Sequence, residues 1–164
     1  MAGASAGGGL CAALAILARD RRGPRIAFQM PLYPMMDDRN QLPSTHEILD
    51  PRTWDRNKNR MAWRYYLGRE PGSDGVVAYA APARADNLAG LPPTYTMVGG
   101  IDLFRDETTL FVMALARAGV PVEFHLVPGA FHGFEHAVPD APVSRQARAQ
   151  YVAALRRGLT GQFA

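Results

Sequence analysis

The chain has 164 residues, enough for one domain with a substantial core, and its 48% hydrophobic and 20% charged content is typical of a soluble globular protein. The formal net charge is +3, and the basic residues, all arginine except Lys58, are scattered, which argues against a nucleic-acid partner. The single cysteine, Cys11, excludes an internal disulfide and favours a reducing, cytoplasmic compartment.

The first half of the sequence predicts a helix, a strand and a long excursion. The nearly all-apolar segment Leu10–Arg19 predicts a buried helix, because no basic residue precedes it and it is far too short to span a bilayer. A strand is expected over Arg25–Met30, closed by the prolines that follow. Residues 35–75 contain no clear strand and are long for a loop, which suggests a functional excursion with one helix over Lys58–Leu67.

The second half of the sequence alternates strands with helices. We expect, in chain order, a loop over Ala80–Pro93, a strand over Thr94–Val98, a helix over Asp106–Ala118, a strand over Val122–Val127, a loop over Pro128–Pro142 and a helix over Val143–Arg157. Strands separated by helices predict a mostly parallel sheet with helices on both faces, an α/β architecture. A strand is also expected before the first helix, where only Met1 and Ala2 stand, so we expect the sequence to begin inside a fold.

A short motif near the N-terminus predicts a catalytic serine. Residues 3–7 match G-x-S-x-G, in which small residues beside the serine allow a sharp turn from a strand into a helix. The Ser5 hydroxyl then stands clear of the turn, and the backbone N–H of Ala6 points at the oxyanion that develops during attack. Serine alone is a weak nucleophile, so it needs a base, and the base needs an orienting acid.

An acid and a histidine lie where this chemistry requires them. In hydrolases with this serine motif, the acid and then the histidine follow the serine in the chain. Reactive groups gather at the carboxyl ends of the strands in open α/β sheets. Asp102 lies just past the strand over Thr94–Val98, and His132 lies just past the strand over Val122–Val127. The pattern therefore predicts a triad of Ser5, His132 and Asp102.

Three stretches of the sequence resemble the hormone-sensitive-lipase-like esterases of the α/β-hydrolase superfamily. They are residues 3–8, which contain the serine motif, residues 102–107 and residues 131–134. The resemblance covers nearly the whole chain and includes Pro31–Pro34. It is specific because the three motifs occur together and in the family's order.

The resemblance implies an activity and a division of roles. Ser5 is the implied nucleophile, His132 the general base and acid, and Asp102 the residue that orients His132. The implied enzyme is a carboxylesterase that hydrolyses small-molecule esters with short acyl chains through an acyl-enzyme. It uses no cofactor and no metal, and its relatives are often homodimers.

Two departures from the family pattern bear on activity. Many members have an acid where this sequence has Ala4, a mild change because small residues also occur there. The family also carries a His-Gly-Gly loop that completes the oxyanion hole, the first strands of the sheet and an N-terminal cap, and none of these precedes Ser5 here. We therefore expect residues 1–164 to form a single, truncated hydrolase domain. We expect weak or no activity, because losing an oxyanion donor costs ~100- to 1000-fold in turnover.

Other acids and histidines are weaker alternatives to the triad. Asp106 competes with Asp102 as the acid, but it suits the N-cap of the helix that follows. His125 falls on the polar face of a strand and is expected at the surface, while His46 lies in the long excursion and His136 four residues past His132. No cluster of histidines, cysteines or carboxylates in the sequence has the spacing of a metal site.

The excursion contains aromatic and charged residues whose roles the sequence leaves partly open. Trp63 is expected in the core, whereas Trp54, Tyr65 and Tyr66 fit either a substrate pocket or the buried face of a helix. The charged residues 37–39 are expected to form a solvated turn.

Three rival functions stand beside the esterase. A non-catalytic remnant would serve as an interaction module. Gly3, Gly7 and Gly9 also resemble the glycine pattern of the nucleotide-binding short-chain dehydrogenases, but that family needs Tyr-x-x-x-Lys. Trp54 stands four residues before the only lysine, Lys58. A peptidase on the same fold would share the triad order, although the local motifs resemble those of esterases.

Overall fold

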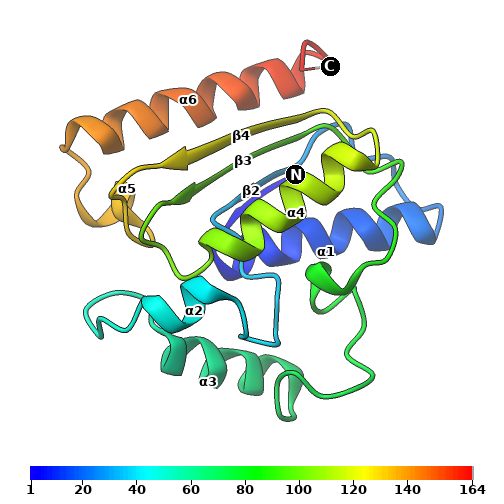
Figure 1. Cartoon of the computed structure of the whole chain (residues 1–164). Helices are drawn as coiled ribbons and strands as arrows, with labels where there is room; N and C mark the ends of the chain where they lie inside the picture. The colour runs from blue at the N-terminus through cyan, green and yellow to red at the C-terminus, as the bar shows by residue number, and fades with distance from the viewer. Residues whose placement is uncertain (164) are drawn as a thin grey trace.

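The computed structural model describes residues 1–163 and shows a layer of strands between helices (Figure 1). The strands are β1 (Ala2–Ala4), β2 (Met30–Leu32), β3 (Thr94–Gly99) and β4 (Val122–Val127). The helices are α1 (Ala6–Asp20), α2 (Pro43–Glu47), α3 (Arg56–Leu67), α4 (Arg105–Arg117), α5 (Phe134–Ala137) and α6 (Pro142–Leu159), with a 3-10 turn, η1, at Pro82–Arg84.

The strands run parallel and lie side by side in chain order. β1 pairs with β2 so that Gly3 is opposite Pro31, and β3 pairs with β4 so that Thr94 is opposite Val122. A parallel bridge between Gln29 and Thr94 joins the β2 segment to β3. The carboxyl ends of all four strands therefore meet along one edge, which is where the loops after β1, β3 and β4 come together.

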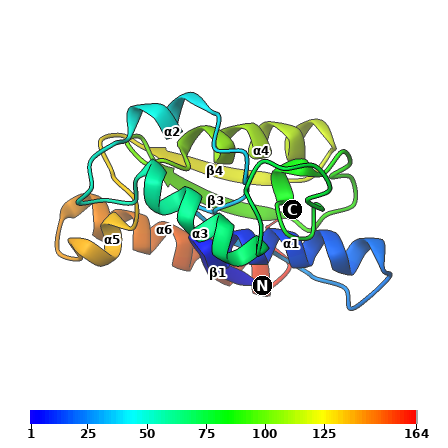
Figure 2. The same cartoon turned by 90° about the horizontal axis from the view of Figure 1, so that it is seen from below.

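Helices cover both faces of this sheet. Ala12 and Ile16 of α1 share one apolar cluster with Phe111 and Leu115 of α4, so these two helices cover the same face. Ala154 of α6 belongs to a second cluster, which includes strand residues. Figure 2 shows α4 and α6 on opposite sides of β3 and β4. The predicted parallel α/β architecture is confirmed.

The strand predicted over Arg25–Met30 is misplaced, because β2 begins at Met30 and includes Pro31. The sequence pattern treats a proline as the end of a strand, since proline has no N–H to donate to a ladder. Here the Pro31 carbonyl accepts a hydrogen bond from the Thr96 hydroxyl at 2.5 Å, which ties this residue to β3. The excursion also contains the five-residue helix α2, which begins at Pro43 and was not predicted.

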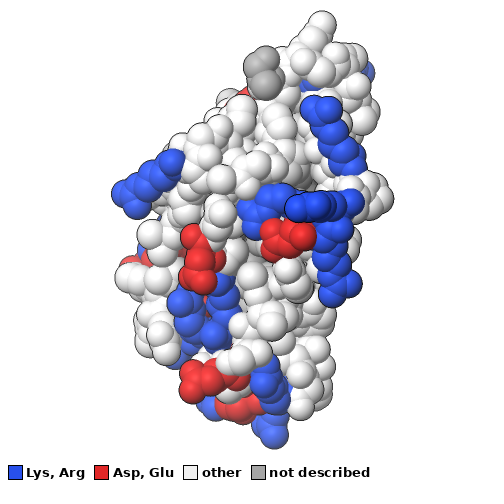
Figure 3. Space-filling view, turned by 90° about the vertical axis from the view of Figure 1, so that its right-hand side faces the viewer, with Lys and Arg blue, Asp and Glu red and all other residues white. Residues whose placement is uncertain are grey.

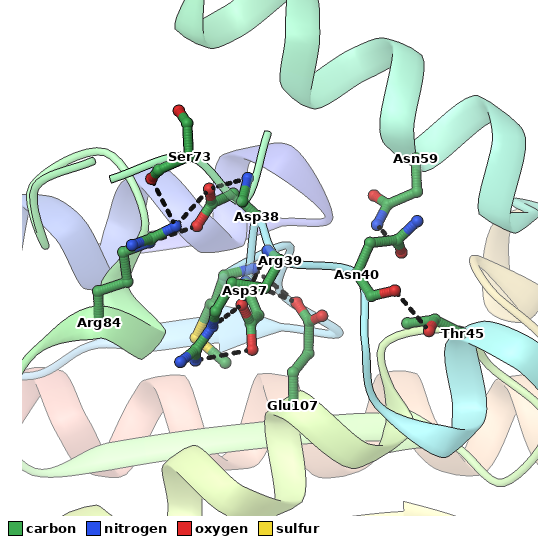
Figure 4. Close-up of polar contacts among 11 residues, drawn as sticks. Asp37, Asp38, Arg39, Asn40, Thr45, Asn59, Ser73, Arg84 and Glu107 are labelled. Carbon is green, nitrogen blue, oxygen red and sulfur yellow. Dashed lines mark hydrogen bonds and ion pairs between the residues drawn. The ribbon is translucent and has the colours of Figure 1, made fainter. Parts of the chain in front are cut away.

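Asp38 forms an ion pair with Arg84 of η1, and the prediction of a solvated turn at residues 37–39 is wrong. Asp38 is fully buried, and its carboxylate accepts hydrogen bonds from Arg84 Nε (2.6 Å) and Nη2 (2.9 Å) and from the Gly72 N–H (Figure 4). The neighbouring Asp37 is also buried and bonds to Arg39. Because Asp38 lies near the start of the excursion and Arg84 lies in η1, after its end, their bond ties the start of the excursion to the segment that follows it.

The N-terminal glycines fit close contacts inside the fold. A Cβ on Gly9 would lie 1.9 Å from the Met35 carbonyl oxygen, and a Cβ on Gly3 would lie 2.1 Å from the Gly7 carbonyl oxygen. A Cβ on Gly7 would meet nothing within 4 Å. The lack of side chains at residues 3 and 9 thus lets α1 approach β1 and the segment after β2.

We predict that Gly9→Ala destabilises the fold and that Gly7→Ala does not. The added methyl group at residue 9 would collide with backbone, whereas at residue 7 it enters open space and improves helix propensity. In urea unfolding, Gly9→Ala should lower the free energy of unfolding by at least ~2 kcal/mol, and Gly7→Ala should change it by less than ~1 kcal/mol. Equal stability of the two variants would contradict this packing.

We also predict that Arg84→Met lowers the free energy of unfolding by about 3–5 kcal/mol at pH 7, because it leaves the buried Asp38 carboxylate unpaired. Burial raises the pKa of Asp38, but the bonds from Arg84 and Gly72 outweigh it, so this pKa lies below its ordinary value. The pair therefore stabilises the fold above pH ~4, and this contribution is lost as the pH falls through the folded-state pKa.

The stability difference between wild type and Arg84→Met should accordingly be widest at pH 7 and narrow in acid. The double variant Asp38→Asn/Arg84→Met serves as the control, because it removes the unpaired charge and should recover part of the loss. A difference that stayed constant from pH 7 to pH 3 would show that the ion pair is not its cause.

Candidate active site

Ser5 lies in a strained turn between β1 and α1. Its backbone has φ 56° and ψ −121°, an unfavourable conformation for a residue with a Cβ. The Ser5 N–H donates to the Leu32 carbonyl at 3.0 Å, and the Ser5 carbonyl accepts from the N–H groups of Gly9 (3.1 Å) and Met35 (3.0 Å). The turn is therefore held by hydrogen bonds on both sides, as the sequence motif predicts for a strand-to-helix elbow.

The three residues of the predicted triad meet at the carboxyl edge of the sheet. Ser5 Oγ lies 2.9 Å from His132 Nε2, and His132 Nδ1 lies 2.9 Å from Asp102 Oδ2. Ser5 follows β1, Asp102 follows β3 and His132 follows β4. Three segments that are far apart in the sequence thus form one continuous chain of hydrogen bonds.

The acid of this chain is fixed by backbone groups. Asp102 is fully buried, and its second carboxylate oxygen, Oδ1, accepts the Phe104 N–H at 2.9 Å. Its carbonyl accepts the Arg105 N–H at 3.1 Å, in the first turn of α4. Oδ2 is therefore aimed at His132 without freedom to rotate, which is the arrangement that an orienting acid needs.

Aromatic rings surround the imidazole of His132. Tyr33 and Phe104 each form a T-shaped contact with it, with centroids at 5.1 and 5.0 Å and interplanar angles of 80°. Trp54 lies at 6.3 Å, so this excursion residue borders the site. Neither Tyr33 nor Phe104 was predicted to be a site residue, although Tyr33 lies within residues 31–34 and Phe104 two residues after Asp102, inside the motifs that resemble the family.

A small apolar cavity opens beside the turn. Its volume is about 100 Å³, and it is lined by Ala6, Gly9, Leu10, Met35, Trp63, Tyr66 and Ala80. Ala6 directly follows Ser5, and Tyr66 brings α3 of the excursion to the cavity wall. Trp63 is buried as predicted, whereas Tyr65 is 79% exposed and points away from the core.

A larger hollow than this cavity lies elsewhere. About 790 Å³ of space lies at the amino ends of the strands, bordered by residues that include Arg22, Pro93 and Phe163, and none of the triad residues lines it. On the side of the molecule seen in Figure 3, several basic side chains adjoin one another beside an acidic one near the middle, and the other basic side chains stand apart.

The alternative acids and histidines do not join the triad. Asp106 accepts the Ser44 N–H at 2.7 Å and lies inside α4 instead of before it, so the predicted N-cap role is wrong. His125 bonds to Glu123 on the same strand, and His46 and His136 are exposed. Among residues 1–163, no group of three potential ligands could hold a metal ion, and no helix is long and apolar enough to cross a bilayer.

Comparison with known proteins places the chain in a family. The family model described as alpha/beta hydrolase fold matches residues 1–136. Esterase LipI of Mycobacterium tuberculosis is 39% identical over 161 residues, which are 98% of this chain and 50% of LipI. Carboxylesterase NlhH of the same species is 35% identical over 97% of this chain and 50% of NlhH.

Solved structures agree with this assignment. Bacterial heroin esterase superposes with a TM-score of 0.93 and 42% identity, over 96% of this chain and 50% of the esterase. Esterase LipW from Mycobacterium marinum gives a TM-score of 0.88 and 35% identity, over 96% of this chain and 49% of LipW. The chain spans about half the length of the curated relatives it matches. It belongs to the hormone-sensitive-lipase-like family of α/β hydrolases, as its motifs predict.

Proposed function

We propose that the chain supplies the catalytic triad of a serine ester hydrolase. Ser5 acts as the nucleophile, His132 as the general base and acid, and Asp102 as the residue that orients His132. The observation that carries this proposal is the unbroken sequence of two 2.9 Å contacts from Ser5 Oγ through the imidazole to Asp102 Oδ2. The esterases among the relatives support the reaction class.

The geometry supports a two-step acyl transfer. Ser5 Oγ attacks the ester carbonyl carbon while its proton passes to His132 Nε2, and Asp102 stabilises the imidazolium that forms. His132 then gives this proton to the leaving alcohol, and an acyl group stays on Ser5. Water attacks the acyl-enzyme while its proton passes to His132, and His132 returns this proton to Ser5 Oγ as the bond to the acyl carbon breaks and the carboxylic acid leaves.

The backbone N–H of Ala6 is the oxyanion donor that we propose. Ala6 is the first residue of α1, so its N–H has no helical carbonyl to bind and the positive end of the helix dipole adds to it. The residue also directly follows the strained Ser5, which brings its N–H close to the reacting carbonyl oxygen. Such a donor is worth ~100- to 1000-fold in turnover.

We propose short-chain esters as the substrate class. The cavity beside Ala6 measures about 100 Å³ and is lined by apolar and aromatic residues. Sites for drug-sized ligands usually measure ~300–1,000 Å³, so this cavity favours a small acyl or alcohol group. The reaction as written uses no metal or cofactor. The single cysteine, Cys11, is buried in α1 and supports the proposal of a cytoplasmic enzyme.

Removal of the nucleophile tests the proposed function. Ser5→Ala should lower kcat for p-nitrophenyl butyrate by at least ~1000-fold, because no other group can form the acyl-enzyme. Asp102→Asn should also cause a large loss, whereas the matched control Asp106→Asn should stay within ~3-fold, since Asp106 lies outside the hydrogen-bonded chain. If the purified chain and Ser5→Ala hydrolyse the ester equally slowly, the proposed function is wrong for this chain.

Enlarging the cavity tests the proposed substrate class. Tyr66→Ala removes a ring from the cavity wall, so kcat/KM for p-nitrophenyl octanoate relative to the butyrate should rise by about tenfold. Tyr65→Ala is the matched control, because the adjacent Tyr65 does not line this cavity, and it should leave the ratio unchanged. A preference that shifted equally in both variants would argue that the acyl group binds elsewhere.

A further inference from the structure

Two buried polar side chains beside His132 take no part in the reaction described above. Tyr33 is 2% exposed and Glu135 is 1% exposed, although both carry groups that normally remain in water. The Tyr33 hydroxyl donates a hydrogen bond to Glu135 Oε1 at 2.5 Å. Burying such groups costs free energy of folding unless they are hydrogen-bonded, and the bond between Tyr33 and Glu135 offsets this cost.

The backbone at Tyr33 adds a second unusual feature. Its φ of 32° lies in the left-handed region, which a residue with a Cβ rarely adopts. The Tyr33 N–H is held by the Met97 carbonyl of β3 at 2.7 Å, and Pro34 follows directly. This strained conformation occurs at the residue whose ring packs against His132, and strained residues of this kind cluster at functional sites.

The Tyr33 ring contacts the imidazole that the triad uses. Its edge-on arrangement with His132, at 5.1 Å and 80°, is matched by that of Phe104, at 5.0 Å and 80°. Hydrogen bonds fix the two imidazole nitrogens, one to Ser5 and one to Asp102. These bonds leave the ring free to tilt about the line that joins the two nitrogens, and the two aromatic rings packed against the imidazole oppose that tilt.

Glu135 connects this contact to the loop that carries His132. It lies three residues after His132, in the first turn of α5. Its backbone carbonyl accepts a hydrogen bond from Arg148 Nη1 of α6 at 3.0 Å, which holds α5 against α6. Burial and the bond to Glu135 hold the pKa of Tyr33 far above its usual range, so the hydroxyl keeps its proton and remains a donor.

We propose that Tyr33 and Glu135 are positioning residues, and that their hydrogen bond fixes the imidazole of His132 in the plane that serves Ser5 and Asp102 together. The proposal rests on the proposed function for its kinetic consequence. The bond also joins the segment after β2 to the loop after β4, two parts of the chain separated by 102 residues. Neither residue touches the reacting atoms.

The test compares Tyr33→Phe, Glu135→Leu and Glu135→Gln with wild type. Tyr33→Phe keeps the ring but removes the hydroxyl, so kcat for p-nitrophenyl butyrate should fall by at least ~10-fold with KM within twofold. In Glu135→Leu, kcat should fall by a similar factor, because leucine cannot accept the Tyr33 hydroxyl. Glu135→Gln retains a carbonyl that can accept the Tyr33 hydroxyl, so its kcat should stay within ~3-fold of wild type.

Tyr79→Phe is the matched control. It also removes a tyrosine-to-carboxylate bond, from Tyr79 to Asp20 at 3.0 Å, at the end of α1 far from Ser5. Its kcat should equal that of wild type. The proposal is overturned if kcat of Tyr33→Phe stays within twofold of the wild-type value. It is also overturned if kcat of Glu135→Gln drops as far as that of Glu135→Leu. If Glu135→Leu fails to fold, Tyr33→Phe decides.

A second readout separates this proposal from the proposed function. In protein labelled with ¹⁵N-histidine, the Nδ1–H proton of His132, bonded to Asp102, should give a sharp signal in wild type and Tyr79→Phe. The signal should broaden in Tyr33→Phe, because a tilting ring exposes this proton to exchange with water. If wild type hydrolyses no ester, the proposed function fails and this signal alone decides. A signal that is unchanged in Tyr33→Phe overturns the proposal.

Discussion

The position of the nucleophile depends on two hydrogen bonds between the turn at Ser5 and the chain in and just after β2. The Leu32 carbonyl accepts the Ser5 N–H and the Met35 N–H donates to the Ser5 carbonyl, both at 3.0 Å. These two bonds offset the strain of a positive φ at a residue with a Cβ. Because β2 is joined to β3 through Gln29 and Thr94, the elbow is tied to the strand that carries Asp102. Parallel pairing thus sets the distance between the nucleophile and the acid.

The segment that follows β2 extends this constraint to the rest of the site. Tyr33 bonds to Glu135, and Asp38 bonds to Arg84. Between them, Glu107 Oε1 accepts the N–H groups of residues 36 and 37 at 2.6 and 3.2 Å (Figure 4). Burial raises the pKa of Glu107 well above its ordinary value. Three buried carboxyl groups therefore fix one short segment to α5, η1 and α4, and the Met35 N–H of that segment donates to the Ser5 carbonyl.

Sequence patterns predicted most of the strands and helices and the proximity of Ser5, His132 and Asp102, because these depend largely on local signals, whereas the catalytic roles of the three residues stay a prediction. The alternation in Val122–Val127 and the serine motif at residues 3–7 are complete within a few residues, and the order of serine, acid and histidine adds the long-range relation. The structure brings Ser5, His132 and Asp102 within hydrogen-bond distance, and the comparisons confirm the family that the motifs indicated.

The sequence could not predict features that depend on partners far along the chain. The turn at residues 37–39 looks solvated until Arg84 is placed beside Asp38, and the two are 46 residues apart. Nothing in the sequence around Tyr33 indicates that its hydroxyl bonds to Glu135. The start of β2 was misplaced because Pro31 looks like a strand end, and only the neighbouring β3 supplies the Thr96 hydroxyl that bonds its carbonyl.

Labelling with an organophosphate tests most directly whether Ser5 is activated by its neighbours. Diethyl p-nitrophenyl phosphate transfers its phosphoryl group to an activated serine and releases p-nitrophenolate, and peptide mass mapping locates the modified residue. The account predicts one phosphoryl group per chain, on Ser5, and at least ~100-fold slower labelling in His132→Ala. Labelling on Ser44, Ser73 or Ser144 instead, no labelling, or an unchanged rate in His132→Ala would contradict it.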